Sequence, residues 1–206
     1  MQRSASMDRL VAGYRAFRGG RYRDEHERYV ELARSGQKPQ TLVIACSDSR
    51  SDPAAIFDAR PGELFVVRNI AAIVPPLEID GAHHGTSAAI AFAVLVLEVR
   101  NILVMGHAQC SGVAAALDGS IGADVPFLRE WIGLLAPAVA RLPPGADRHV
   151  ALERDAVKLS MERLMSYPFV ADRVRTGELE INGARFGIAD GKLEILDART
   201  KEFVTI

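Results

Sequence analysis

The residues 41–50, TLVIACSDSR, decide the fold expected for this chain. They open as a short apolar run, 42–45, with the length and β-branched content of a fully buried strand. The run stops abruptly in residues 46–50, which carry a thiol, a carboxylate and a guanidinium. Open α/β sheets usually bind ligands at the carboxyl ends of buried parallel strands. By itself, the stretch is equally consistent with a buried structural cysteine followed by a Ser/Asp helix cap.

Length and composition limit the kind of protein. The 206 residues suit a single domain with a real core, and 49% hydrophobic and 25% charged residues are ordinary for a soluble globular protein. A net charge of -1 gives no electrostatic case for a nucleic acid partner or an acidic membrane surface. No segment has the apolar length of a signal peptide or a membrane span, so we expect a cytoplasmic protein with no membrane partner.

The chain has only two cysteines, Cys46 and Cys110. No disulfide framework can therefore stabilise the fold. In a reducing compartment, such a pair more often binds a metal or takes part in chemistry than forms a bridge.

The first 36 residues read as a helical arm. Residues 6–36 have the pattern of two amphipathic helices separated by Gly19 and Gly20, with too little apolar surface for a domain of their own. We expect one domain over 1–206, with the arm at 1–36 and an α/β core at 37–206. The arm is expected to lie across the main body or across a partner subunit.

The core alternates strands and helices. Apolar runs at 64–67 and 101–105 follow the first strand, and helical patterns cover 86–99, 111–117, 126–139 and 147–166. This alternation predicts a parallel sheet with right-handed crossovers. Two period-two segments, 177–183 and 192–197, predict an antiparallel hairpin at a sheet edge. The expected fold is α/β: a central, mostly parallel β-sheet flanked by helices, with the N-terminal arm and an antiparallel edge strand near the C-terminus.

Potential soft-metal ligands follow two of the buried strands. Cys46 ends the first, and His107 with Cys110 follows the third. An H-x-x-C spacing places imidazole and thiolate within one turn or one tight loop, so both can reach a single ion. Zinc favours such ligands, and three of them with one open position describe a catalytic zinc site. A structural zinc site would need a fourth protein ligand, and the other histidines do not follow directly after a buried strand.

Three ordered blocks resemble the signature blocks of the β-class carbonic anhydrases. They are CSDSR at 46–50, PGELFVVRNIA at 61–71 and GHAQC at 106–110, and SYPFV at 166–170 and GKL at 191–193 also resemble that family. The resemblance spans about residues 37–197. It implies a lyase, carbonate dehydratase, that reversibly hydrates carbon dioxide to bicarbonate and a proton by attack of zinc hydroxide on CO2.

The resemblance also assigns residues to roles. It implies one Zn²⁺ per chain, with Cys46, His107 and Cys110 as ligands. It makes Asp48 and Arg50 a catalytic pair, in which Asp48 accepts a hydrogen bond from the zinc-bound hydroxide. Arg50 would hold Asp48 ionised and keep it from closing the site as a fourth ligand. The alternative for this pair is a helix cap and a surface ion pair.

Four residues fall at the positions of a substrate pocket. By resemblance, Gln37 would donate a hydrogen bond to bicarbonate, and Phe65 and Phe92 would form an apolar wall suited to carbon dioxide. Phe92 stands where the open, plant-like members carry tyrosine, and without the family both rings would read as plain core residues. Ser111 stands where the family usually has glycine, and its backbone N–H is expected to face the substrate.

Three further residues bear on the subtype and on the path of the proton. Val43 stands where the bicarbonate-regulated members carry tryptophan, so the chain resembles the constitutively open type. His83 and His84 titrate in a range suitable for proton export, although histidines at helix entries are more often merely solvated. We interpret Arg68 and Asn69 as structural supports, because polar groups at strand ends usually satisfy nearby backbone.

The resemblance implies a homodimer, or a higher assembly of dimers, with the arm wrapped on the partner and pockets at the subunit interface. Three rival functions remain on the sequence alone. The same zinc site could act on carbon disulfide or carbonyl sulfide. The protein could be a catalytically silent zinc protein used for binding, against which the intact Asp48 and Arg50 argue. A redox switch through Cys46 and Cys110 would instead predict metal-free protein with a reversible disulfide.

Overall fold

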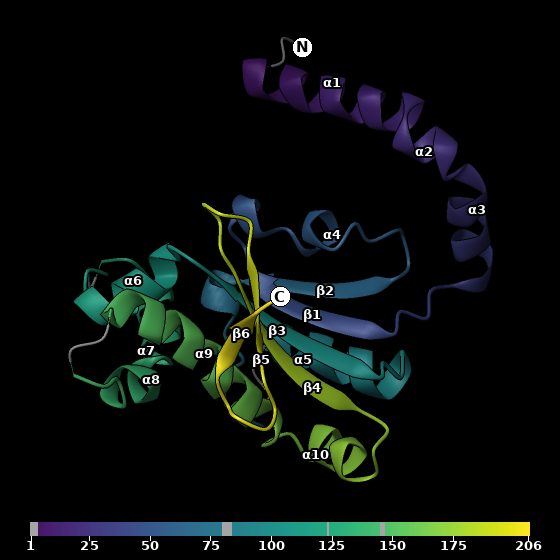
Figure 1. Cartoon of the computed structure of the whole chain (residues 1–206). Helices are drawn as coiled ribbons and strands as arrows, with labels where there is room; N and C mark the ends of the chain where they lie inside the picture. Colours follow the sequence, from purple (N-terminus) through teal and green to yellow (C-terminus); the bar gives the residue numbers. More distant parts are fainter. Residues whose placement is uncertain (1–3, 80–83, 123, 145–146) are drawn as a thin grey trace. The chain divides into compact units, whose positions relative to one another are not determined.

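The computed structural model describes residues 4–79, 84–122, 124–144 and 147–206 (Figure 1). The chain divides into an arm unit, Met1–Gln37, and a core unit, Lys38–Ile206. The arm unit contains three helices: α1 Ala5–Gly19, α2 Arg21–Asp24 and α3 His26–Ser35. The break expected at Gly19 and Gly20 is confirmed.

Aromatic rings hold the arm unit together. The rings of Phe17 and Tyr22 lie 5.9 Å apart, and those of Tyr22 and Tyr29 lie 4.9 Å apart. The side chain of Ser4 caps α1 by accepting from the backbone N–H of Met7. Within the described part of the arm, none of the helical residues is buried. The arm therefore has no core of its own, as its composition predicted.

The core unit is built on one six-stranded sheet with the order β2-β1-β3-β4-β5-β6. The strands β1 to β4 run parallel, whereas β5 and β6 are antiparallel to their neighbours. This arrangement confirms the expected α/β fold, and β6 adds an edge strand that the sequence had not indicated. The strand bounds are β1 Thr41–Cys46, β2 Leu64–Asn69, β3 Asn101–His107, β4 Glu180–Phe186, β5 Leu193–Leu196 and β6 Phe203–Thr205.

The register brings the predicted ligands to one edge. In the sheet, β1 lies between β2 and β3, with Cys46 opposite Asn69 and Ala45 opposite Met105. Because β1 and β3 are parallel neighbours, their carboxyl ends meet, and Cys46 and His107 end these two strands.

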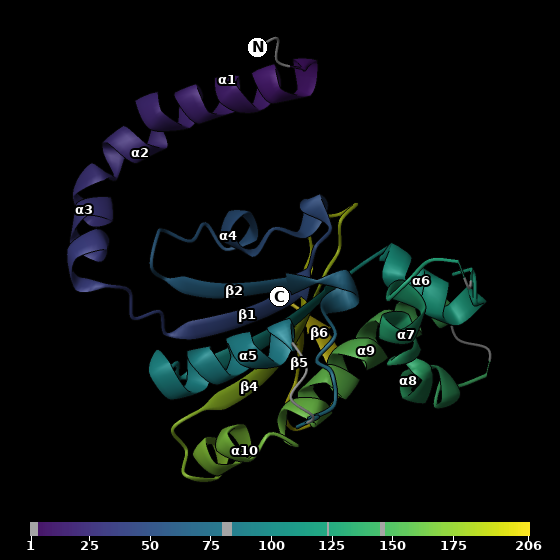
Figure 2. The same cartoon turned by 180° about the vertical axis from the view of Figure 1, so that it is seen from behind.

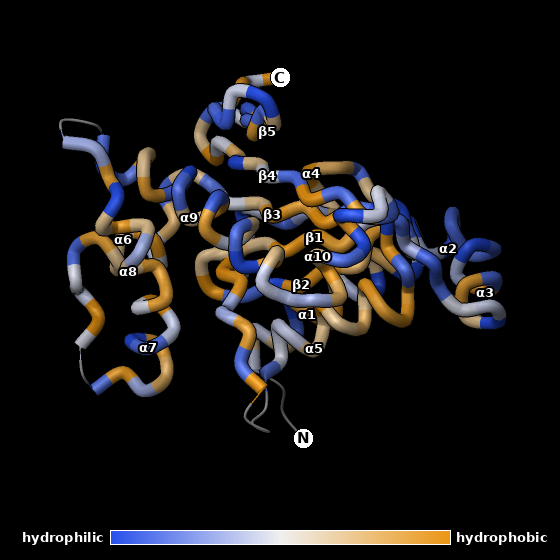
Figure 3. The backbone as a smooth tube through the Cα atoms, turned by 90° about the horizontal axis from the view of Figure 1, so that it is seen from below, coloured by the Kyte–Doolittle hydropathy of each residue, from blue (hydrophilic) through white to orange (hydrophobic). Residues whose placement is uncertain are grey.

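Both faces of the sheet are apolar, as expected for parallel strands covered on each side. Leu42 and Ile44 of β1 face one hydrophobic cluster with residues of α5, α9 and α10. Figure 2 shows α5 in front of the strands. Val43 and Ala45 face the opposite cluster, which includes Ile56 of α4. The hydropathy colouring is correspondingly orange along β1 and β3 in Figure 3.

Two predicted helices differ from the observed ones. The segment 126–139 forms two helices, because Pro137 lacks an N–H and its ring conflicts with the carbonyl four residues earlier. The segment 86–99 gives a short α-helix and a π-helical turn, Phe92–Val96, and Glu98 with φ 56° turns the chain away. The helix bounds are α4 Pro53–Ile56, α5 Gly85–Ala91, α6 Ser111–Asp118, α7 Leu128–Gly133, α8 Ala136–Ala140, α9 Arg148–Leu164 and α10 Pro168–Arg175. Among the described residues, none of these helices is long and apolar enough to cross a membrane.

Candidate metal centre

Three potential metal ligands converge at the carboxyl ends of β1 and β3. One ligand atom each from Cys46, His107 and Cys110 lies within 4.8 Å of the others, and all three residues are buried. The two Sγ atoms are 3.9 Å apart. Cys46 ends β1, His107 ends β3, and Cys110 is the residue that precedes α6. The structure thus brings together the three ligands that the sequence predicted.

The imidazole of His107 is prepared for a metal. Its Nδ1 lies 2.8 Å from the carbonyl oxygen of Ala108, so Nδ1–H donates there and Nε2 keeps its lone pair. Nε2 is buried and has no hydrogen-bond partner among the described residues. A buried unpaired nitrogen is costly unless something binds it, and two thiolates beside it match the donor set that zinc prefers.

Backbone amides stabilise charge on both thiols. Cys46 receives hydrogen bonds from the backbone of Asp48 and Ala71, and Cys110 from that of Gly112 and Val113 at the start of α6. Gly112 makes this arrangement possible, since a Cβ there would lie 2.8 Å from Cγ2 of Ile70. The site therefore supplies the environment that thiolate ligands need.

The two thiols influence each other's ionisation. The hydrogen bond from Cys110 lowers the pKa of Cys46 well below its usual range, against the opposing effect of burial. The same hydrogen bond, together with burial, raises the pKa of Cys110 above its usual range. Burial opposes charge on His107, but the negative charge on Cys46 and the carbonyl oxygen of Ala108 leave the pKa of the imidazole raised. These directions favour charge on Cys46 over charge on Cys110, and binding of a cation would release a proton from Cys110.

Asp48 and Arg50 form a two-pronged ion pair beside the thiols. Nε of Arg50 lies 3.0 Å from Oδ1 of Asp48, and Nη2 lies 2.7 Å from Oδ2. The backbone N–H of Arg50 also donates to Oδ1 at 2.9 Å. The side-chain hydrogen bond from Arg50 holds the pKa of Asp48 well below its usual range, and Asp48 raises the pKa of Arg50. The helix cap and the ion pair considered as an alternative for Asp48 and Arg50 are therefore both present. The same carboxylate also borders a cavity beside the thiols, called the metal-site cavity below.

That cavity has a volume of about 370 Å³ and lies beside the predicted ligands. Asp48 and Ser111 line it together with both cysteines, and the rest of its wall is mostly apolar. Its lining residues are Cys46, Ser47, Asp48, Ile70, Cys110, Ser111, Gly112, Ala115, Ile121, Leu128 and Ile132. The arrangement places a carboxylate, metal ligands and an apolar wall around one small volume.

The other predicted pocket residues lie elsewhere in the chain. Phe65 on β2 and Phe92 form a separate pair with ring centroids 5.8 Å apart, and Phe92 is 45% exposed. Gln37 is the last residue of the arm unit and is exposed. His84 precedes α5, and His83 lies outside the described residues.

Arg68 and Asn69 bind backbone around the centre, as interpreted from the sequence. Arg68 donates to the carbonyl oxygens of Cys46 at 2.9 Å and Asp48 at 2.5 Å, and to the carboxylate of Asp52 at 3.0 Å. Asn69 exchanges hydrogen bonds of 2.9 Å with the backbone of Ile73. These contacts fix the turn after β1 and the segment after β2.

Sequence reasoning missed a second support. Glu153 of α9 and Arg185 of β4 are both buried and form an ion pair at 2.6 Å. Glu153 also accepts a hydrogen bond from the backbone of Gln109, between His107 and Cys110. The only signal in the sequence was an acidic residue within the apolar pattern of residues 147–166.

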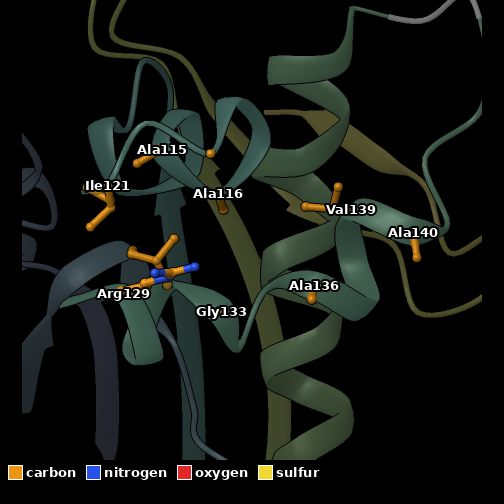
Figure 4. Close-up of a pocket in the computed structure, with 10 residues that line it drawn as sticks. Ala115, Ala116, Ile121, Arg129, Gly133, Ala136, Val139 and Ala140 are labelled. Atoms are coloured by element: carbon orange, nitrogen blue, oxygen red, sulfur yellow. The ribbon is translucent and has the colours of Figure 1, made fainter. Parts of the chain in front are cut away.

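A neighbouring cavity differs in chemistry from the metal-site cavity. It also measures about 370 Å³ and lies between α6, α7 and α8 (Figure 4). Small and apolar residues line it, with Arg129 as its one charged member. It contains none of the predicted site residues, and it shares Ala115, Ile121 and Ile132 with the metal-site cavity.

Known proteins share both this sequence and this fold. The family profile described as carbonic anhydrase matches residues 41–193. Beta carbonic anhydrase 3 of Arabidopsis thaliana is 35% identical in an alignment of 206 residues. The alignment covers 95% of this chain and 79% of that protein. The β-carbonic anhydrase CcaA has a TM-score of 0.87 at 29% identity, covering 98% of this chain and 93% of its own. A β-carbonic anhydrase from Sordaria macrospora, one of two described as tetrameric, has a TM-score of 0.81 at 29% identity, covering 95% and 98%.

The match to the family profile contains every predicted metal ligand, and the Arabidopsis relative extends it over nearly the whole chain. The Cys-His-Cys group fits the zinc that enzymes of this kind use. The chain therefore belongs to the β-class carbonic anhydrases, zinc-dependent lyases that reversibly hydrate carbon dioxide to bicarbonate and a proton.

Proposed function

We propose that this carbonic anhydrase works as an open-site enzyme, in which Cys46, His107 and Cys110 hold one zinc ion and Asp48 stays off the metal. The observation that carries the proposal is the two-pronged Asp48–Arg50 pair, with contacts of 2.7 and 3.0 Å, in the cavity of the ligands. When bound, zinc supplies Lewis acidity that lowers the pKa of a water molecule. The roles of the surrounding residues follow from their contacts.

Asp48 orients the nucleophile. Each of its oxygens accepts from Arg50, which leaves further lone pairs on the carboxylate for the proton of a water or hydroxide. Because Arg50 holds the pKa of Asp48 below its usual range, Asp48 acts as an acceptor throughout the neutral range. The guanidinium fork also resists rotation of the carboxylate toward the ligands.

The cavity wall suits the substrate. Ile70, Ile121, Leu128 and Ile132 give an apolar surface for carbon dioxide, which carries no net charge. Ser111, the first residue of α6, supplies a hydroxyl and a backbone N–H for an oxygen of bicarbonate.

Gln37, Phe65 and Phe92 enter the proposal through a second copy of the chain. Exposed apolar side chains on the π-helical turn, Phe92 at 45%, Leu95 at 57% and Val96 at 62%, support a subunit contact there. The arm adds exposed Leu10. In a homodimer or an assembly of dimers, these surfaces would be covered, and the three residues would complete a pocket against the partner's metal site. The tetrameric Sordaria relatives support an assembly of this kind.

We also propose that the enzyme is cytoplasmic and that residues 1–206 act as one functional domain. The arm would contribute to the contact between subunits. The support is chemical: both cysteines are free, and they must stay reduced to bind a metal.

Metal analysis combined with stopped-flow carbon dioxide hydration tests the proposal. We expect one zinc per chain and hydration at neutral as well as alkaline pH. Activity confined to alkaline pH would contradict the open site, because it would mean that Asp48 occupies the metal until hydroxide displaces it. Metal-free protein with a reversible Cys46–Cys110 disulfide would instead support a redox function.

A further inference from the structure

Glu153 is a buried acid that the reaction does not require. Glu153 is 5% exposed, and both of its carboxylate oxygens accept hydrogen bonds. Oε1 accepts the backbone N–H of Gln109 at 2.6 Å. Oε2 accepts Nε and Nη2 of Arg185 at 2.8 and 2.6 Å. One carboxylate thus joins α9, β4 and the loop between two metal ligands.

The packing of α9 explains how Glu153 reaches that loop. A Cβ on Gly106 would lie 2.8 Å from Cγ2 of Val157 and 3.5 Å from the carbonyl oxygen of Glu153. On β4, a Cβ on Gly183 would lie 2.9 Å from Cγ1 of Val157. The two glycines therefore allow α9 to approach the end of the sheet closely, and the approach determines where Glu153 points.

The tethered residue lies between His107 and Cys110. Gln109 has φ 55°, in the left-handed region that non-glycine residues rarely adopt. This conformation turns the chain sharply between the two ligands. A charge-assisted hydrogen bond to the amide of Gln109 holds the turn, and so holds the imidazole and the thiol within reach of one ion.

Stability alone does not account for this pair. Burying two charges carries a large desolvation cost, and apolar residues of similar volume are often at least as stabilising. Arg185 has a further, longer contact of 3.3 Å with Glu194, which in turn pairs with Arg154 at 2.7 Å. The arrangement gains something that an apolar pair would not supply, namely an acceptor aimed at Gln109.

We propose that Glu153 is a positioning residue of the zinc site, oriented by Arg185, and that it slows the release of the metal. Partners of this kind typically change metal affinity by 10- to 100-fold when removed. The inference rests on the three ligands but not on catalysis, because release of zinc is measured without carbon dioxide.

The test is the rate at which zinc-loaded protein transfers its metal to an excess of 4-(2-pyridylazo)resorcinol at fixed pH. The double variant Glu153→Leu/Arg185→Leu removes the tether without leaving a buried unpaired charge, and we expect release roughly 10- to 100-fold faster. Glu153→Gln keeps an oxygen acceptor without charge, so we expect a smaller acceleration. Glu162→Gln is the matched control: it makes the same substitution on the same helix, in an exposed ion pair with Arg141, and it is expected to release zinc at the rate of the unaltered chain.

A second readout separates positioning from folding. In cobalt-substituted protein, we expect the thiolate-to-metal absorption bands of Glu153→Gln to shift, whereas those of Glu162→Gln stay in place. Release at the unaltered rate from a folded double variant would overturn the proposal. If the double variant does not fold, Glu153→Gln decides: a lowered Tm with unchanged release and unchanged cobalt bands would mean a purely structural role.

Discussion

The two turns that carry the proposed metal ligands are held by opposite chemistry. The turn after β1 is held directly by Arg68, whose guanidinium donates to the carbonyl oxygens of Cys46 and Asp48. The turn after β3 is held by Glu153, whose carboxylate accepts a backbone N–H, with Arg185 behind it. Since β2 and β4 flank β1 and β3 in the sheet, each outer strand contributes one arginine to the turn of its inner neighbour.

The difference follows from which backbone groups each turn presents. The first turn presents carbonyl oxygens toward β2, and a guanidinium satisfies them without an intermediary. The second presents the N–H of Gln109 toward α9, so it needs an anion, and the anion in turn needs a counter-charge. The side chain of Arg68 is 26% exposed and that of Arg185 is 10% exposed. The support of the first turn is thus more accessible to water than the support of the second.

Removing a ligand from either turn should have the largest effect. Cys46→Ser and Cys110→Ser each replace a thiolate with a hydroxyl that zinc binds poorly. We expect both variants to lose zinc and, with it, carbon dioxide hydration. Metal analysis after gel filtration, with circular dichroism to confirm folding, provides the measurement. A Cys110→Ser protein that kept one zinc per chain would show that the ligand set is wrong.

Asp48→Asn should separate chemistry from metal binding. The amide keeps the shape of Asp48 but weakens both contacts with Arg50 and the acceptor for the nucleophile. We expect retained zinc and a fall in kcat on the order of 100-fold, the lower end of the usual acid–base range. Stopped-flow hydration at equal zinc content is the measurement. Loss of zinc in this variant would assign Asp48 to the metal instead.

The sequence was sufficient to predict the features that depend on neighbouring residues in the chain. Apolar runs ending in polar residues located β1, β2 and β3, and the parallel order then brought Cys46, His107 and Cys110 together. The buried Glu153 could not be found in this way, because its burial depends on Arg185, which lies 32 residues further along on another element. The predicted roles of Gln37, Phe65 and Phe92 need a second copy of the chain and stay predictions.

Arg68→Gln should loosen the first turn while leaving the second unchanged. The variant loses charge-assisted contacts to two carbonyl oxygens and to Asp52. Hydrogen bonds to charged groups contribute about 1.5–3 kcal/mol each in favourable cases, and this side chain is partly exposed, so we expect a loss of about 2 kcal/mol. Urea unfolding of the zinc-free protein measures it. An unchanged midpoint would mean that the turn keeps its form without Arg68.

Part of the acid dependence of stability should come from the first turn. The pKa of Asp48 is lowered in the folded state, mainly by Arg50. A lowered folded pKa contributes stability above the unfolded value of about 3.9, and this contribution is lost as the pH falls toward the folded pKa. In zinc-free protein, the stability difference between the unaltered chain and Asp48→Asn should therefore narrow below about pH 4. Urea midpoints at pH 3, 4 and 6 measure it, and a constant difference would contradict the pairing.

The smallest effect concerns a left-handed residue near each turn: Ala71 with φ 63°, which is followed by Ala72 with φ 54°, beside the first, and Gln109 with φ 55° within the second. A left-handed residue with a Cβ costs about 1–2 kcal/mol, and glycine loses about 0.5–1 kcal/mol in chain entropy. Ala71→Gly and Gln109→Gly should therefore each gain roughly 0.5 kcal/mol in urea unfolding, by the same difference of terms.

Lys201→Gly is the matched control for these two variants, because Lys201 has φ 62° in the turn before β6. Equal gains at all three positions would mean that the strain is a local backbone property. A loss at Gln109 alone would mean that the second turn depends on its side chain as well as on its tethered N–H. That outcome would extend the difference between the two turns from their supports to the turns themselves.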